Sequence, residues 1–309
     1  MINATALTKR YGDKVAVNDL TFTVRPGIVT GFLGPNGAGK STTMRMIVGL
    51  DRPSSGAVTV NGRPYAQHAA PLREVGTLLE AKAVHTSRSA RDHLLALADT
   101  HGIGKQRVSD VIELVGLEEV AGKRAGGFSL GMGQRLGIAS ALLGDPATVM
   151  LDEPVNGLDP EGVRWVRDLL RNLAQEGRTV FVSSHLMSEM AVTAEHLIVI
   201  GRGTLLADMS LADFISANST ASVRVRSPNA HEFAGLLAGP HVTVTSTEAE
   251  MLDITGLTAA EVGDLALRQQ IPLHELRTVQ ASLEEAFMAM TEDSVEYHAT
   301  LDHHGKAAA

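Results

Sequence analysis

The sequence predicts an α/β protein with a largely parallel sheet, a helical insertion and a small C-terminal α+β domain. Apolar runs at 28–33, 148–151 and 179–183 have the length of buried strands, and stretches with helical spacing separate them. Strands that alternate with helices in this way favour a parallel sheet covered on its faces. A chain of 309 residues is long enough to build this core and a second, smaller one.

The first predicted strands lead into a glycine-rich segment. Alternation of apolar and polar residues over 15–24 predicts a half-buried strand, and the apolar run 28–33 predicts a buried one. Helical spacing continues from Ser41 to Leu50, and turn signals enclose a short strand at 57–60. The glycine-rich segment therefore connects the end of a strand to the start of a helix.

The pattern of apolar residues changes twice in the rest of the chain. Residues from about 82 to 144 carry apolar stripes at helical spacing, which predicts a helical insertion. Beyond 209 the expected order is strand, helix, strand, strand, helix, strand, which is typical of a split βαβ domain. We therefore expect a first domain at 1–209, an accessory α+β domain at 210–300 and a disordered tail at 301–309.

Individual elements of the accessory domain follow from the same periodicities. The expected strands are 222–226, 242–245, 252–255 and 273–276, and the expected helices are 231–238 and 259–268. A final helix is predicted from Ser282, whose hydroxyl caps the helix while Glu285 reaches back to the same turn.

Charge and composition exclude several classes of protein. A formal net charge of −8 argues against general binding of nucleic acid, which requires a basic face. The chain has no cysteine, so disulfides and thiolate metal sites are excluded. Its first residues do not resemble a secretory signal, and no apolar run reaches the roughly 18 residues that span a bilayer. We expect a cytoplasmic protein whose membrane role, if it has one, depends on a partner.

The glycine-rich segment 34–41 fits the pattern G-x-x-x-x-G-K-[ST]. Its backbone N–H groups converge on phosphate oxygens, Lys40 adds a positive charge near the β and γ phosphates, and Ser41 can bind Mg²⁺. The alternative is a glycine-rich turn that matches by chance, and the flanking strand and helix disfavour it. The segment predicts a site for ATP and Mg²⁺, formed by Asn36, Gly37, Gly39, Lys40, Ser41 and Thr42.

A second apolar strand ends in two carboxylates, Asp152 and Glu153. In a parallel sheet they lie at the same edge as the phosphate-binding segment. Asp152 is predicted to hold Mg²⁺, directly or through water, and Glu153 to act as the general base on the attacking water. The alternative for the pair is a solvated acidic turn, which the preceding strand makes the weaker reading.

Further motifs follow in a fixed order. Ser129-Leu130-Gly131-Met132 lies between the two elements above, Asp159 lies shortly after them, and His185 comes just past a strand. With these motifs the sequence resembles the nucleotide-binding subunits of ABC transporters from residue 1 to about 208. The resemblance implies a P-loop NTPase fold of the ABC ATPase type, with ATP hydrolysis as its activity.

The resemblance also implies roles for single residues. Ser129 and Gly131 match the signature segment, which contacts the γ phosphate bound to the opposite subunit, and Asp159 matches the loop that links the two sites. His185 matches the histidine that hydrogen-bonds the γ phosphate, and Tyr11 matches the aromatic residue that stacks on adenine. Because the signature segment contacts the opposite subunit's nucleotide, the resemblance also implies a head-to-tail dimer that encloses two ATP molecules. Each residue also has a structural alternative. Ser129 fits a helix N-cap and Asp159 a turn residue, while His185 fits a polar residue at a strand end and Tyr11 a packing aromatic.

Two positions depart from the usual family pattern. Glu80 stands where the family has a glutamine that senses Mg²⁺ and water; its carboxylate can coordinate the metal but cannot donate. The alternative is a plain surface glutamate. Met132 replaces the amide that usually ends the signature. Together with the C-terminal run 281–287, this pairing is similar to the ABC-2-type exporter group, which includes drug-resistance, antibiotic-export and bacteriocin-immunity ATPases.

The combined prediction is an ATPase subunit that powers a separate transmembrane permease from the cytoplasmic face of the cell membrane, as a dimer with a second copy of itself. The resemblance implies that a permease helix docks near 80–88. The main alternative is a soluble ABC-type ATPase that acts on ribosomes or DNA, and a purely regulatory nucleotide-binding module is a further one. The tail pair His303-His304 has no fixed third ligand, and we expect no metal there.

Overall fold

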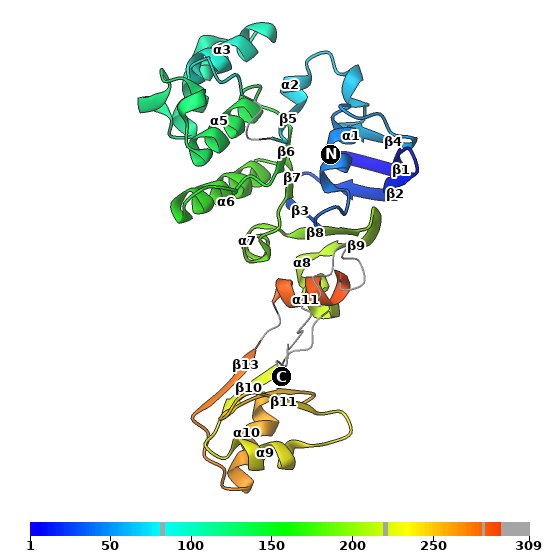
Figure 1. Ribbon diagram of the computed structural model, residues 1–309, viewed down its shortest axis with the longest axis vertical. Helices are drawn as coiled ribbons and strands as arrows, with labels where there is room; N and C mark the ends of the chain where they lie inside the picture. The colour runs from blue at the N-terminus through cyan, green and yellow to red at the C-terminus, as the bar shows by residue number, and fades with distance from the viewer. Residues whose placement is uncertain (81–83, 219–221, 280–281, 292–309) are drawn as a thin grey trace, which may run out of the picture. The chain divides into compact units, whose positions relative to one another are not determined.

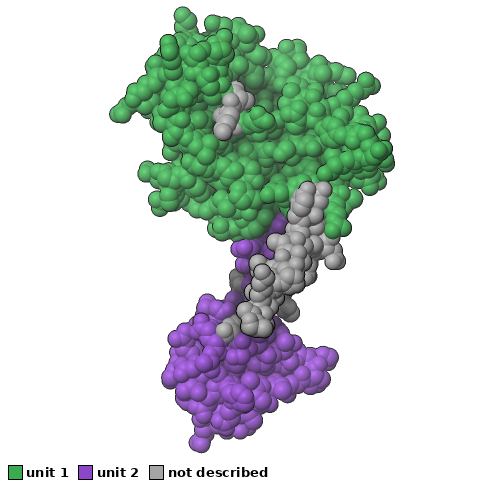
Figure 2. Space-filling model, viewed as in Figure 1, with its two compact units in different colours: residues 1–211, 291–309 green, residues 212–290 purple. Residues whose placement is uncertain are grey.

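The computed structural model describes residues 1–80, 84–218, 222–279 and 282–291 (Figure 1). It contains two compact units, one of Met1–Leu211 together with Thr291 and one of Ala212–Met290 (Figure 2). The tail predicted at 301–309 lies outside the described residues. In the described part of the chain, we find no helix with the length and apolar character needed to cross a membrane.

The first unit begins with an antiparallel sheet in the order β2-β1-β4. Its strands are β1 Ile2–Tyr11, β2 Lys14–Val24 and β4 Ser55–Val60. The sequence patterns did not predict β1, because register shifts after Ala4 and Leu7 interrupt the alternation of buried and exposed residues. Ala6 has a φ of 49° at the first of these shifts, as expected of a β-bulge.

A six-stranded sheet in the order β5-β6-β7-β3-β8-β9 forms the centre of the first unit. Its strands are β3 Val29–Leu33, β5 Val75–Leu78, β6 Thr148–Asp152, β7 Thr179–Ser183, β8 His196–Gly201 and β9 Thr204–Ser210. All neighbouring pairs are parallel except β8 with β9. The expectation of a largely parallel sheet is confirmed, and β9 is an antiparallel edge strand that was not predicted.

The helices of the first unit cover this sheet and form the insertion (Figure 1). They are α1 Lys40–Ile47, α2 Pro71–Glu74, α3 Ala90–Thr100, α4 Lys105–Leu114, α5 Leu130–Leu142, α6 Pro160–Gln175 and α7 Met187–Thr193. Helices α3, α4 and α5 contact one another, which agrees with the predicted helical insertion.

One hydrophobic core of the first unit joins the two sheets to α1. The rings of Phe22, Phe32 and Phe181 pack with centroids 5.0 to 6.0 Å apart, and each comes from a different strand. Burial of apolar side chains of this size stabilises the fold by roughly 1.5–3 kcal/mol each. This packing fixes the strand ends at which the functional residues lie.

The second unit has the order strand, helix, strand, strand, helix, strand, as predicted. These elements are β10 Ser222–Arg226, α9 Ala230–Leu237, β11 Thr243–Glu248, β12 Met251–Thr255, α10 Ala259–Arg268 and β13 Glu275–Val279. The antiparallel sheet has the order β11-β12-β10-β13, the arrangement of a split βαβ domain. The last strand begins two residues later than the first residue of the predicted range 273–276, because its register with β10 pairs Glu275 with Arg226 and Val279 with Ser222.

Helices α8 Leu211–Asn218 and α11 Leu283–Thr291 flank this sheet in the sequence. The predicted cap of α11 is present: the Glu285 amide donates to the Ser282 hydroxyl at 3.1 Å, and the Ser282 amide donates to the Glu285 carboxylate at 2.9 Å. Phe214, Leu283 and Ala286 are buried.

Candidate functional site

The glycine-rich segment lies between β3 and α1, as predicted, and it borders a cavity of about 440 Å³. Gly37 and Gly39 have φ values of 83° and 102°, which favour glycine. A Cβ atom on Gly39 would lie 2.6 Å from the Ala16 carbonyl oxygen, so no larger residue fits there. The cavity is lined by Tyr11, Lys14, Ala16, Asp152, Glu153 and every residue from Pro35 to Thr42.

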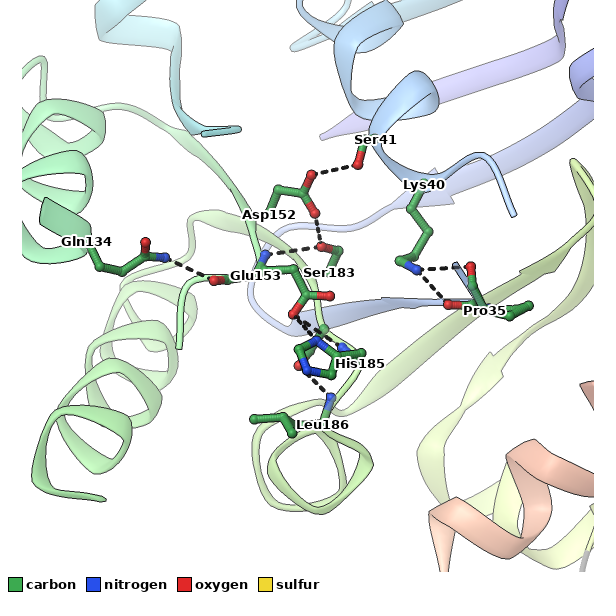
Figure 3. Close-up of polar contacts among 11 residues, drawn as sticks. Pro35, Lys40, Ser41, Gln134, Asp152, Glu153, Ser183, His185 and Leu186 are labelled. Carbon is green, nitrogen blue, oxygen red and sulfur yellow. Dashed lines mark hydrogen bonds and ion pairs between the residues drawn. The ribbon is translucent and has the colours of Figure 1, made fainter. Parts of the chain in front are cut away.

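Lys40 is held against the loop that precedes it. Its ammonium donates to the carbonyl oxygen of Gly34 at 2.5 Å and to that of Pro35 at 3.3 Å (Figure 3). The side chain is buried, and burial lowers the pKa of Lys40, against the opposing effect of the Glu153 and Asp152 carboxylates. A partly desolvated positive charge at the edge of the cavity attracts an anion strongly.

Asp152 joins the start of α1 to the end of β7. Its carboxylate accepts a hydrogen bond from the Ser41 hydroxyl at 2.9 Å and a second one from the Ser183 hydroxyl (Figure 3). A hydroxyl and a carboxylate oxygen are the hard ligands that Mg²⁺ prefers. Among the described residues there is no group of three or more His, Asp or Glu side chains that could hold a metal ion.

Glu153 stands at the end of β6 in a backbone conformation that is rare for a residue with a side chain, with φ at 50°. Its amide donates to the carbonyl and hydroxyl oxygens of Ser183, both at 3.2 Å. Its carboxylate accepts from Nδ1 of His185 at 2.7 Å and from the His185 amide at 3.3 Å. Two of the three residues that were predicted to be catalytic, Glu153 and His185, are therefore in direct contact (Figure 3), and the third is Lys40.

Tyr11 ends β1 at the rim of the cavity. Its hydroxyl donates to Asp51 at 3.0 Å, and the Lys9 ammonium lies 4.9 Å from the ring centroid. Burial, followed by the hydrogen bond to Asp51, raises the pKa of the Tyr11 hydroxyl. The ring is half exposed, and its polar tip is fixed, which suits an aromatic platform beside a bound base.

Ser129, Gly131 and Asp159 are not among the described residues that line this cavity. Ser129 caps α5, since its hydroxyl accepts from the Met132 amide at 3.2 Å, and Asp159 caps α6 by accepting from the Gly162 amide at 2.8 Å. A Cβ atom on Gly131 would lie 3.0 Å from the carbonyl oxygen of Gly157, so the two helix starts are close to each other.

Glu80 is also not among the described residues that line the phosphate-binding cavity. Its side chain is exposed and lines a second cavity of about 320 Å³, together with Arg45, Leu79 and His93. The Glu80 charge contributes to the raised pKa of Arg45, although Asp51 contributes more. The two cavities differ in the described residues that line them, and Glu80 lines the second.

Sequence reasoning missed three residues that contact the site. Ser183 bonds both Asp152 and Glu153, Gln134 donates to the carbonyl oxygen of Glu153 at 2.9 Å, and Asp51 fixes Tyr11. The available signals were weak: a serine at the end of an apolar strand, and a single amide among the apolar residues of a helix. The fold and the site together define a P-loop NTPase.

Comparisons with known proteins agree with this class and narrow it. The family model described as ABC transporter matches residues 17–156, and a domain of unknown function, DUF8746, matches residues 221–284. The ABC transporter ATP-binding protein YhcH of Bacillus subtilis (strain 168) is 36% identical over 294 residues, 94% of this chain and 95% of YhcH. The chain belongs to the ATP-binding proteins of ABC transporters.

Two further similarities bear on the predictions. The bacitracin transport ATP-binding protein BcrA of Bacillus licheniformis is 43% identical over 212 residues, 68% of this chain and 69% of BcrA. A solved ATP binding subunit of an ABC transporter matches with a TM-score of 0.65 at 25% identity, over 70% of this chain and 92% of that one. The predicted fold class and the resemblance to the exporter group are confirmed, and the protein is an ATPase. These relatives do not support the alternative of an ATPase acting on ribosomes or DNA.

Proposed function

We propose that this chain drives antibiotic export as part of a transporter with a separate transmembrane permease. Two copies of the chain form a closed dimer around two ATP molecules, and dimer closure changes the conformation of the permease. One observation carries the proposal: the Glu153 carboxylate lies 2.7 Å from Nδ1 of His185 and, with Asp152, borders the cavity of the phosphate-binding segment. A base, an orienting imidazole and a phosphate cradle at one sheet edge are what phosphoryl transfer to water requires.

Each residue of the cavity has a defined task in this proposal. Glu153 accepts a proton from the attacking water, and His185 holds the Glu153 carboxylate in place and hydrogen-bonds the γ phosphate. Lys40 leaves the carbonyl oxygens of the loop and neutralises charge on the β and γ phosphates. Ser41 and Asp152 hold Mg²⁺, which supplies further charge neutralisation on the phosphates when bound.

The proposed dimer accounts for the residues that lie away from the cavity. Ser129 and Asp159 cap the first turns of α5 and α6, and helix N-termini attract phosphate. Because these helix starts do not border the chain's own cavity, we assign Ser129 and Gly131 to the nucleotide held by the second copy and Asp159 to the loop that links the two sites. Closure costs free energy, so ATP drives it only by binding the closed dimer better than the open one.

The second cavity supports a docking surface for the permease. Its lining is mainly apolar, with Leu50, Leu78 and Leu97 beside the charged groups of Arg45 and Glu80, a mixture suited to receiving a helix. We propose that Glu80 approaches Mg²⁺ only in the closed dimer, which would connect the docking surface to the nucleotide.

The proposal locates the chain peripherally at the cytoplasmic face of the cell membrane, since the permease holds it there. Residues 210–300 form the accessory domain in this scheme. No contact with nucleic acid is part of it, in keeping with the net charge of −8.

The decisive test is Glu153→Gln. This change keeps the size of the side chain and removes the base, so we expect turnover to fall by about a hundredfold or more while ATP traps a dimer that size-exclusion chromatography detects. Glu113→Gln is the matched control, because Glu113 is exposed on α4 and does not line the cavity. Hydrolysis at the wild-type rate by Glu153→Gln would refute the role of Glu153. Co-purification with the permease tests the partner separately.

A further inference from the structure

Gln134 is a buried polar residue with a single described target. Its side chain is 2% exposed, and its Nε2 atom donates to the carbonyl oxygen of Glu153 at 2.9 Å (Figure 3). Leu136 and Ile138, two and four positions further along α5, are fully buried and apolar. An amide in such surroundings is costly unless it is hydrogen-bonded, so this bond fixes the Gln134 side chain.

The target peptide is the one from which the general base extends. Glu153 has a φ of 50° and must be held in that conformation by its surroundings. Ser183 holds the amide side of the residue, as described above. On the carbonyl side the Asn156 amide donates at 3.2 Å from within the same turn, and Gln134 donates from a separate helix. Of these donors, only Gln134 connects the Glu153 carbonyl group to α5.

Helix α5 is a firm support for this contact. The neighbouring residue Arg135 donates to the carbonyl oxygen of Val115 at 2.8 Å, and its guanidinium lies 4.7 Å from the centroid of the Trp165 ring. Arg135 therefore ties α5 both to the end of α4 and to α6. Through its hydrogen bond, Gln134 attaches the backbone of Glu153 to this fixed helix.

We propose that Gln134 is a positioning residue for ATP hydrolysis: it holds the Glu153 peptide so that the carboxylate stays aimed at the attacking water. The inference rests on the role proposed for Glu153. Without the Gln134 amide, the turn keeps its internal bond from Asn156 but loses its attachment to α5. Binding of ATP is unaffected, because Gln134 does not line the nucleotide cavity. The loss therefore falls on kcat and leaves KM unchanged.

The test is Gln134→Met, which keeps an unbranched side chain of similar length and removes the donor. We expect kcat to fall about tenfold to a hundredfold, the range in which a small misplacement of a catalytic group acts. KM and the affinity for a fluorescent ATP analogue should stay within about twofold, below the 1.4 kcal/mol that a tenfold change represents. Thr148→Val is the control: Thr148 is buried on the same strand as Asp152, and its hydroxyl bonds Asn61 far from the cavity.

A second variant covers the case in which methionine disturbs folding. Gln134→Leu is also apolar and of similar size, and it has no hydrogen to donate, so it should lose kcat in the same way. Wild-type kcat in either folded variant, or an equal loss of kcat in Thr148→Val, would overturn the proposal. A parallel rise in KM would also overturn it, since it would indicate general damage to the nucleotide site.

A double mutant separates this inference from the role of Glu153. In the Glu153→Gln background there is no base left to aim, so adding Gln134→Met should not lower the residual turnover further. A further tenfold loss in that background would refute positioning through Glu153. If Glu153→Gln itself turned over normally, the proposed function would fail first, and the double mutant distinguishes the two outcomes.

Discussion

Replacing Ser183 with alanine should separate the metal site from the rest of the cavity. The Ser183 hydroxyl donates to the Asp152 carboxylate and accepts from the Glu153 amide at 3.2 Å. In Ser183→Ala the Glu153 amide keeps its second acceptor, the carbonyl oxygen of residue 183, also at 3.2 Å. Among the described contacts of the Asp152 carboxylate, only the hydrogen bond from the Ser41 hydroxyl then remains. The main loss is therefore one charge-assisted hydrogen bond to Asp152.

The expected size of the effect follows from this bond. A hydrogen bond to a charged group contributes about 1.5–3 kcal/mol, and each 1.36 kcal/mol corresponds to a factor of ten in rate. We expect kcat/KM for ATP to fall about tenfold to a hundredfold, because a freed Asp152 holds Mg²⁺ less well. The assay is steady-state hydrolysis at several Mg²⁺ concentrations, in which the variant should need more Mg²⁺ for half-maximal rate.

Ser184→Ala is the control for this experiment. Ser184 is also fully buried and next in the sequence, but its hydroxyl accepts from the Leu186 amide at 3.0 Å instead of donating to Asp152. The control should keep the wild-type dependence on Mg²⁺. Equal losses in the two variants, or an unchanged Mg²⁺ dependence in Ser183→Ala, would refute the reasoning.

Three further predictions concern charge and burial. Burial lowers the pKa of Lys40 below its value in the unfolded chain, so the charged side chain reduces the free energy of unfolding at neutral pH. We therefore expect Lys40→Met to unfold at a higher urea concentration than the wild type and to hydrolyse no ATP. Asp51→Ala frees the Tyr11 hydroxyl, and we expect the KM for ATP to rise about two- to fivefold, as loss of one ordinary hydrogen bond predicts. Burial, followed by the charges of Arg88 and His85, lowers the pKa of His93 below its ordinary value of 6.5. As the pH falls below 6.5, His93 is protonated in the unfolded chain before it is protonated in the folded one, so the free energy of unfolding falls. His93→Leu should reduce this loss in urea titrations at pH 7 and pH 5.

Each of these has a contrary outcome. A less stable Lys40→Met protein would show that the contacts of the ammonium with the loop outweigh its burial. An unchanged KM in Asp51→Ala would remove Asp51 from the support of Tyr11. If wild type and His93→Leu lost stability equally between pH 7 and pH 5, the acid sensitivity would belong to other groups.

Local patterns predicted much of the site because its parts are encoded in short stretches. The segment 34–41 combines glycines, a lysine and a serine between a strand and a helix, and positive φ at Gly37 and Gly39 is a local requirement. Asp152 and Glu153 were assigned to the same sheet edge because carboxyl ends of parallel strands meet there. The Ser41 and Asp152 side chains do meet, at 2.9 Å.

Other features could not be predicted from local patterns. Strand β1 escaped detection because its bulges break the alternation that marks a strand. Glu80 follows β5 as expected, yet whether its side chain faces the phosphate cavity or the second one depends on how α3 and α5 pack beside it. No pattern in the sequence states that packing.

The sequence by itself determined the class of this protein. Its phosphate-binding segment and its carboxylate pair are each formed by contiguous residues, and the order of the motifs can be read directly along the chain. The tertiary structure alone decided how Glu153 is held. Its partners Ser183, His185 and Gln134 lie 30, 32 and 19 residues away along the chain. Hydrogen bonds require groups to lie within about 3 Å, and only the packed sheet and helix α5 bring these groups so close.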